Sequence, residues 1–213
     1  MTRAPPTVLC VHQGSERYGS DKSFVAAVAA IRHKAGWAAR ILLPGRGPID
    51  GLVADAALPP ARTRHIWVLR KADLPRELTI GLPRNLWAVG RAMADLWRHD
   101  IVYVNTAVIV DFLFASILTR RRLIVHVREI PAGIAMTVIR RLLIAARARV
   151  IFNSRATATA FGLPPFIEQA VVHNGFDLPA PPARRAGGRA RLRVLCIGRL
   201  NAWKGQEVLV EAC

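Results

Sequence analysis

Short apolar runs that alternate with helical segments constrain the fold of this chain more than any other feature. The runs TVLCVH at 7–12 and AARILL at 38–43 are too short for helices and are typical of strands that are buried on both faces. Between them the sequence predicts a helix over 21–35, with Ser20 as its N-cap and Gly36 as its stop. A strand, a helix and a strand in this order form the crossover unit of a parallel sheet.

The same alternation continues through most of the chain. Further strands are predicted at 65–69, 101–105, 149–153 and 170–173, with another that begins at Leu123, and helices at 83–98, 106–118, 134–146 and 155–161. Residues 74–82 are expected to be irregular because proline and glycine interrupt them, and Arg64 and His65 are expected to face water at a strand end. We therefore predict an α/β fold with a Rossmann-like parallel sheet in the N-terminal domain.

Polar residues follow the predicted strands at the edge where open α/β sheets bind ligands. In LIVHVREI, His126, Arg128 and Glu129 come at or just after the end of a buried strand, which makes them candidates for a site. The alternative for His126 is a hydrogen-bonded core histidine. Asn105 and Thr106 end another strand, and their alternative is a helix cap.

The loop after the first strand is rich in glycine, but it matches neither common nucleotide motif. Gly14 and Gly19 have the spacing of a P-loop, yet Ser20 and Asp21 precede Lys22, so the lysine would be misplaced. The dinucleotide pattern GxGxxG is absent, which argues against a hydride-transfer enzyme.

The last twenty residues, VLCIGRLNAWKGQEVLVEAC at 194–213, form a second motif. The apolar run at 194–197 predicts a strand, and apolar residues at helical spacing predict a helix after Gly205. The turn between them carries Arg199 and Lys204 beside the free N–H groups of the helix N-terminus. A phosphate or diphosphate would suit this turn.

Residues 178–192 combine proline, glycine and arginine with no apolar periodicity, and we interpret them as a linker. The predicted domains are then 1–177, which carries the Rossmann-like sheet, and 193–213, which begins a second domain. A single strand and helix cannot bury both of their faces, so we expect the chain to stop early in that second domain.

Three motifs, LIVHVREI, HNGFD and GRLNAWKG, resemble glycosyltransferase family 4, whose members have two Rossmann-like domains in the GT-B arrangement. The resemblance implies an acceptor-side domain followed by a truncated donor-side, nucleotide-sugar-binding domain. It also implies transfer of a sugar, with retention, from a nucleotide-diphosphate sugar to a glycan or lipid-linked acceptor such as a cell-envelope polysaccharide. No metal or other cofactor is expected, and no Asp-x-Asp is present. The family's Glu-x7-Glu motif would lie beyond Cys213, so this chain alone is expected to be inactive.

The resemblance also implies roles for individual residues. His126 would lie against the transferred sugar, while Arg199 and Lys204 would stabilise the negative charge that develops on the diphosphate leaving group. The substrate-binding residues that it implies are Gly19, Ser20, Arg128, Glu129, Asn174 and Gly175. The glycine-rich turn departs from the family's Gly-Gly-Ala-Glu, because here Tyr18-Gly19-Ser20-Asp21 stands in its place.

The charge of the chain supports an alternative function that is not enzymatic. Its 31 basic and 14 acidic residues give +17, which favours anionic partners, although biased composition also explains such a charge. A non-catalytic α/β module that binds anionic polymers or membranes would associate with nucleic acid in a salt-sensitive way. No aromatic-interleaved basic segment or known nucleic-acid module is recognisable, so no specific nucleic-acid partner is expected.

Location is predicted from two further features. The longest apolar stretch, 107–118, contains Asp111 and is shorter than the roughly 20 residues that span a bilayer. The cysteines, Cys10, Cys196 and Cys213, have no metal-site spacing and are expected to be reduced. We therefore expect a cytoplasmic protein, with peripheral contact at the anionic inner face of the membrane compatible with its basic surface.

Overall fold

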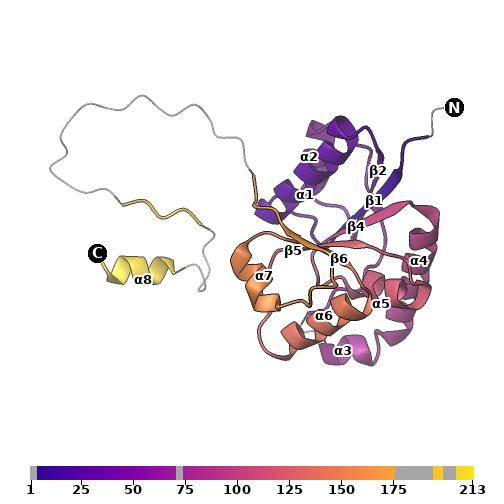
Figure 1. Ribbon diagram of the computed structural model, residues 1–213. Coiled ribbons are helices and arrows are strands. Elements are labelled where there is room, and N and C mark those ends of the chain that lie inside the picture. Colours follow the sequence, from indigo (N-terminus) through magenta and orange to yellow (C-terminus); the bar gives the residue numbers. More distant parts are fainter. Residues whose placement is uncertain (1–3, 71–73, 176–193, 199–204) are drawn as a thin grey trace. The chain divides into compact units, whose positions relative to one another are not determined.

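A computed structural model describes residues 4–70, 74–175, 194–198 and 205–213 of the chain (Figure 1). The chain divides into two compact units, Met1–Gly175 and Phe176–Cys213, which are described separately. The whole of the predicted linker, 178–192, lies outside the described residues, and the domain limits 1–177 and 193–213 stay predictions.

The first unit is built on a parallel sheet of seven strands in the order β3-β2-β1-β4-β5-β6-β7. The strands are β1 Thr7–His12, β2 Ala38–Leu43, β3 Arg62–Thr63, β4 Ile101–Asn105, β5 Ile124–Val127, β6 Arg149–Phe152 and β7 Gln169–Val171. Every neighbouring pair is parallel, so all carboxyl ends lie along one edge of the sheet. This confirms the predicted α/β, Rossmann-like fold.

Helices connect the strands and cover both faces of the sheet (Figure 1). They are α1 Gly19–Ala29, which continues as the π-helical turn η1 Ala30–Lys34, then α2 Ile49–Asp55, α3 Leu74–Leu78, α4 Leu82–Arg98, α5 Val110–Thr119, α6 Ile134–Ala145 and α7 Arg155–Phe161. Gly36 has a φ of +70°, a conformation that favours glycine, and it ends the first helical segment as predicted.

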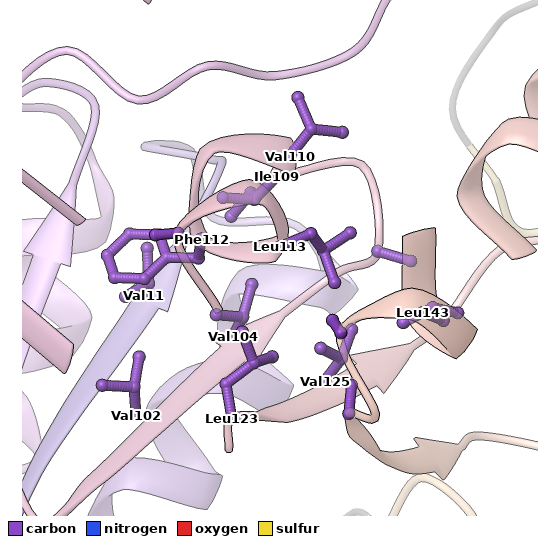
Figure 2. Packing of buried hydrophobic residues seen from close by; sticks show 14 of the residues in the cluster. Val11, Val102, Val104, Ile109, Val110, Phe112, Leu113, Leu123, Val125 and Leu143 are labelled. Carbon is purple, nitrogen blue, oxygen red and sulfur yellow. The ribbon is translucent and has the colours of Figure 1, made fainter. Parts of the chain in front are cut away.

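Alternate residues of β1 point to opposite faces and join different hydrophobic clusters. Val11 belongs to the larger cluster, in which strand residues pack against Phe112 and Leu113 of α5 and against Leu143 of α6 (Figure 2). Cys10 belongs to the smaller cluster, with Phe24 of α1. The two clusters explain why the strand sequences are apolar at nearly every position.

The third strand differs from the prediction. Residues 65–69 do not extend the sheet, and β3 is only Arg62–Thr63. The Leu69 N–H donates to the carbonyl of Val108, and Val68 forms an isolated antiparallel bridge with Ile109. The apolar run instead pairs with the segment that precedes α5. This pairing provides hydrogen-bond partners for the backbone of the run, although the run is not a strand of the sheet.

Two further predictions in this region are wrong. Residues 74–78 form α3, because proline is tolerated in the first turn of a helix. Arg64 does not face water: its guanidinium forms a buried ion pair with Asp95 of α4, with 2.9 Å between Nη2 and Oδ2, and it lies over the ring of Phe112. His65 is half-buried and forms a hydrogen bond with the side chain of Asn85.

In the second unit, α8 Gln206–Glu211 confirms the helix predicted after Gly205. Residues 194–197 form no strand, and their side chains are exposed. A parallel strand needs a neighbour to accept and donate its backbone hydrogen bonds, and residues 194–197 have no such ladder partner among the described residues. Within the described ranges, no helix has both the length and the apolar character needed to cross a bilayer.

Candidate functional site

The candidate site lies at the carboxyl edge of the sheet, where β1 meets β4. The strand order reverses between these two strands, and open α/β sheets bind their ligands at such a point. His12 ends β1 directly opposite Asn105, which ends β4. His126 lies in the next strand, β5, and all three side chains are buried.

These residues belong to one buried polar network, which we define as Asp21, His12, Asn105, Tyr103 and His126. His12 Nε2 lies 2.9 Å from Asp21 Oδ1, and His12 Nδ1 lies 2.9 Å from Asn105 Nδ2. Tyr103 donates its hydroxyl hydrogen to Asn105 Oδ1 across 3.3 Å, and the same hydroxyl lies 2.8 Å from His126 Nδ1. The network thus runs without interruption from the first turn of α1 to β5.

Asp21 anchors the network at its α1 end. Burial by itself would raise the pKa of this carboxyl, but hydrogen bonds from His12 and from the Tyr18 N–H outweigh burial and lower the pKa below its usual value. Gly14 allows the loop to pass over this pair, because a Cβ there would lie 2.5 Å from Asp21 Oδ1. Asp21 is therefore an ionised, buried acceptor.

His126 ends the network at β5 with one ring nitrogen bonded and the other without a partner. Its side chain is only 9 % exposed, and burial, followed by the nearby Arg128 charge, lowers its pKa to about 4. The imidazole is therefore neutral at physiological pH. Nε2 is buried and has no hydrogen-bond partner among the described residues. A buried polar atom without a partner is a reason to look for a ligand.

Arg128 and Asn174, two of the predicted substrate-binding residues, are brought together. The Arg128 guanidinium donates to Asn174 Oδ1 across 2.8 Å, and Asn153 donates from Nδ2 to the Arg128 carbonyl across 3.0 Å. Burial lowers the pKa of Arg128, although the group remains a cation. Segments that follow β5, β6 and β7 therefore converge beside His126.

The other predicted residues lie outside this cluster or outside the described residues. Glu129 and Gly175 are exposed, and Gly19 and Ser20 are exposed in the first turn of α1. The predicted N-cap was wrong, because the helix begins at Gly19 and Tyr18 is the N-cap residue.

Arg199 and Lys204 lie outside the described residues, so their predicted roles stay predictions. Thr106 is not in α5, whose first residue is Val110, and its hydroxyl accepts a long hydrogen bond, of 3.5 Å, from the Val108 N–H.

A cavity of about 190 Å³ opens at the same edge, beyond the ends of β1 and β2. Its polar lining includes Gln13, His65, Arg70 and Glu77. His65 Nε2 lies 2.8 Å from Asn85 Oδ1, and Asn85 Nδ2 donates to Glu77 Oε2 across 2.8 Å. These paired groups give the cavity several hydrogen-bonding side chains, which suits a polar ligand such as a sugar.

Asp111, in the first turn of α5, is a second buried carboxyl near this edge. Burial raises its pKa to about 7, against the weaker opposing effect of the Arg64 cation. Oδ1 accepts from the Phe112 N–H, whereas Oδ2 has no partner among the described residues. Asp111 therefore changes its charge near neutral pH.

Sequence reasoning did not identify His12, Asp21 and Tyr103 as site residues. A signal was present for two of them, since His12 is the one polar residue that ends an otherwise apolar run and Tyr103 shares a strand face with Asn105. Asp21 carried no such signal, because its place beside His12 depends on how the loop at Gly14 folds back.

The part of the chain that the structure describes contains no group of three or more His, Cys, Asp or Glu side chains that could hold a metal ion. No protein-family model matches this chain, and no curated protein matches it. Solved structures do resemble it, and the fold they share is the Rossmann-like domain of GT-B glycosyltransferases.

One similar structure is Alr3699/HepE of Anabaena in complex with UDP and glucose, with a TM-score of 0.61 and 22% identity over 81% of this chain and 45% of that one. Another is MurG of Acinetobacter baumannii, with a TM-score of 0.52 and 20% identity over 83% of this chain and 47% of that one. The lipopolysaccharide outer core galactosyltransferase WaaB, in its apo form, has a TM-score of 0.53 and 10% identity over 85% of this chain and 50% of that one. The chain therefore spans about half the length of these proteins.

Proposed function

We propose that this chain belongs to a glycosyltransferase of the GT-B class that transfers a sugar, with retention, from a nucleotide-diphosphate sugar. The observation that carries the proposal is the buried polar network, which ends at the ligand edge of this fold in a neutral His126, one of whose nitrogens has no partner among the described residues. The fold supports it, since similar structures include one complex with UDP and another with UDP-glucose.

In this proposal the residues at the carboxyl edge bind the sugar. His126 and Arg128 offer one neutral imidazole and one cation within a partly desolvated region, where polar and charged groups interact more strongly than in water. Arg199 and Lys204 would act on the diphosphate, where negative charge develops as the bond to the leaving group breaks. The cations take the place of a metal, so we expect transfer to survive chelation.

The acceptor is proposed to be a glycan or a lipid-linked sugar. The cavity near Gln13 and His65 supports this, because it lies on the same edge as the network and has polar groups suited to hydroxyls. A cytoplasmic location with peripheral contact at the inner face of the membrane accords with such an acceptor. The donor-side contacts at 193–213 would belong to the start of the second domain.

The test begins with the reading frame downstream of Cys213. We expect it to continue with a Glu-x7-Glu motif, and we expect the longer protein to release nucleoside diphosphate from one member of a panel of nucleotide sugars. Lys204→Ala should lower turnover at least tenfold, whereas the matched change Lys34→Ala, at an exposed lysine of η1, should not. The proposal is wrong if no nucleotide sugar is turned over, or if Lys204→Ala leaves turnover within a factor of two.

A further inference from the structure

We propose that Asp21 sets the direction of every hydrogen bond in the buried polar network and thereby holds His126 in the tautomer with hydrogen on Nδ1. In that tautomer Nε2 carries a lone pair and can only accept a hydrogen bond. Asp21, His12, Asn105 and Tyr103 would then be positioning residues, which act on a ligand only through His126.

The argument begins at Asp21, because an ionised carboxylate has no hydrogen to donate. Its Oδ1 lies 2.9 Å from His12 Nε2, so the hydrogen of that bond must be on the imidazole. The pair is buried, and Oδ2 of the same carboxylate accepts from the Tyr18 N–H. His12 in its neutral form therefore has hydrogen on Nε2 and a lone pair on Nδ1.

The lone pair of His12 then fixes the orientation of the next residue. Nδ1 requires a donor, and Asn105 presents its amide nitrogen, Nδ2, 2.9 Å away, closer than its backbone carbonyl oxygen at 3.4 Å. With Nδ2 turned toward His12, the amide oxygen Oδ1 faces Tyr103, which donates its hydroxyl hydrogen across 3.3 Å. The direction of the His12–Asn105 hydrogen bond therefore determines the direction of the Asn105–Tyr103 hydrogen bond.

The last bond follows from the one before it. Tyr103 has one hydroxyl hydrogen, and Asn105 receives it, so the hydroxyl oxygen can only accept from His126 Nδ1, 2.8 Å away. The hydrogen of the neutral His126 ring is then on Nδ1. Burial and the Arg128 cation disfavour a second proton, which leaves Nε2 as a lone pair.

For a ligand, the consequence is selectivity for groups that donate. If the proposed glycosyl transfer holds, this inference names the contact: a sugar hydroxyl would donate to His126 Nε2, while the cation of Arg128 would disfavour a positively charged group there. The tautomer itself depends only on the network and can be measured without any ligand.

Histidine nitrogen NMR on the 213-residue chain tests the tautomer directly, since protonated and unprotonated ring nitrogens resonate far apart. Near pH 8 ordinary histidines are neutral, as their pKa is about 6.5. Two histidines supply internal references. His99 Nδ1 lies 2.9 Å from the Asp95 carbonyl and must carry hydrogen on Nδ1, whereas His65 Nε2 faces Asn85 Oδ1 and carries hydrogen on Nε2.

We expect the ring nitrogens of His126 to resonate in the same pattern as those of His99, with hydrogen on Nδ1 and none on Nε2. In Tyr103→Phe, which removes only the hydroxyl, the hydrogen should move to Nε2, the preference of imidazole in water, so that the pattern becomes that of His65. In Asp21→Asn the amide can donate to His12 Nε2, so His12 and His126 should each become a mixture of tautomers. The signals of His99 and His65 should not move in either variant, which shows that the fold is retained.

Hydrogen on Nε2 of His126 in the unmodified chain would overturn the inference, and so would a doubly protonated His12, which would reverse the direction of the network. A His126 that responds to Tyr103→Phe but not to Asp21→Asn would overturn the claim that Asp21 sets the direction. Failure of the proposed transfer reaction would leave all of these signals unchanged, so the two proposals fail separately.

Discussion

The two edges of the parallel sheet differ in how they hold their polar groups. At the carboxyl edge, the buried polar network pairs its members with one another and leaves a single nitrogen, on His126, without a partner among the described residues. At the amino edge, exposed arginines line three adjoining hollows of about 210, 440 and 300 Å³, all of which include Arg122. The other arginines that line these hollows are Arg120, Arg121, Arg147 and Arg149.

The arginines at the amino edge have a structural explanation. α5 and α6 both end there, and the C-terminus of a helix attracts cations. Arg120 and Arg147 follow these helices with φ values of 56° and 45°, the left-handed conformation that commonly ends a helix. Arg121 lies over the ring of Trp97, 4.5 Å from its centroid. The comparison teaches that helix ends account for the arginines of the amino edge, whereas the carboxyl edge holds a buried, paired network with one nitrogen that has no partner among the described residues.

The largest effect that separates the two edges should come from Asp21→Ala. Removing this carboxylate takes away the acceptor that faces the buried His12 Nε2 and an acceptor of the Tyr18 N–H, which we expect to cost about 3–5 kcal/mol in the free energy of unfolding. Arg122→Ala, at the exposed edge, should cost no more than about 0.5 kcal/mol. Urea denaturation of both variants measures the difference, and equal losses would contradict the comparison.

A second effect concerns Asp111, which is buried and has no ion pair among the described residues. Its pKa is about 7 in the folded chain and about 3.9 when unfolded, so between these values the folded state keeps a proton that the unfolded state releases. The free energy of unfolding should therefore fall as pH rises from about 4 to 7. Asp111→Asn does not titrate and should become more stable than the unmodified chain by roughly 4 kcal/mol at pH 8, because the folded and unfolded pKa values of Asp111 differ by about three.

The measurement is a series of urea titrations across this pH range, in which the two proteins should have equal stability near pH 4. Asp55→Asn, at a carboxylate that is 73% exposed, is the matched control and should follow the unmodified chain. A constant difference between Asp111→Asn and the unmodified chain at every pH would rule out the buried titration.

A smaller effect should distinguish Gly14, in the loop after β1, from Gly19, the first residue of α1. Gly14→Ala places a methyl group against Asp21 and His12, which should cost about 1–2 kcal/mol and broaden the His126 nitrogen signals. Gly19→Ala meets no atom of the described residues within 4 Å and should cost no more than about 0.5 kcal/mol. Thermal unfolding with histidine NMR measures both, and a Gly19→Ala variant that is the more damaging of the two would show that the loop is packed differently.

The smallest effect on the fold should come from the amino edge. Replacing Arg120, Arg122 and Arg147 together by glutamine should change the free energy of unfolding by about 1 kcal/mol or less, and it should leave the His126 tautomer unchanged. Binding to duplex DNA should weaken and lose part of its salt dependence, because fewer phosphates are neutralised. Tight, salt-sensitive binding of the unmodified chain to duplex DNA regardless of sequence would favour the rival class of anionic-polymer binders.

The order of strands and helices could be predicted because each buried strand is a short apolar run that periodicity detects. The segment 65–69 shows where periodicity fails to predict a strand of the sheet. Its apolar residues pack against the segment before α5, and an apolar pattern alone does not reveal which segment a strand pairs with. Arg64 was misplaced for a similar reason: its partner Asp95 lies 31 residues away in sequence. Long-range pairs of charges leave no local pattern.

The candidate site was predictable in position but not in composition. His126 and Arg128 follow from their place at the end of a buried strand, whereas Asp21 and Tyr103 enter the site through contacts made by the folded chain. The direction of the hydrogen bonds depends on all five members of the network at once. No single motif in the sequence encodes it.

The most direct test of this account is to map where a nucleotide sugar binds on the 213-residue chain. Backbone and histidine NMR during a titration with UDP-glucose should show the largest shifts at His12, Asn105, His126, Arg128 and Asn174. Shifts confined to the exposed arginines of the amino edge, or no shifts at millimolar ligand, would contradict the assignment of the site to the carboxyl edge.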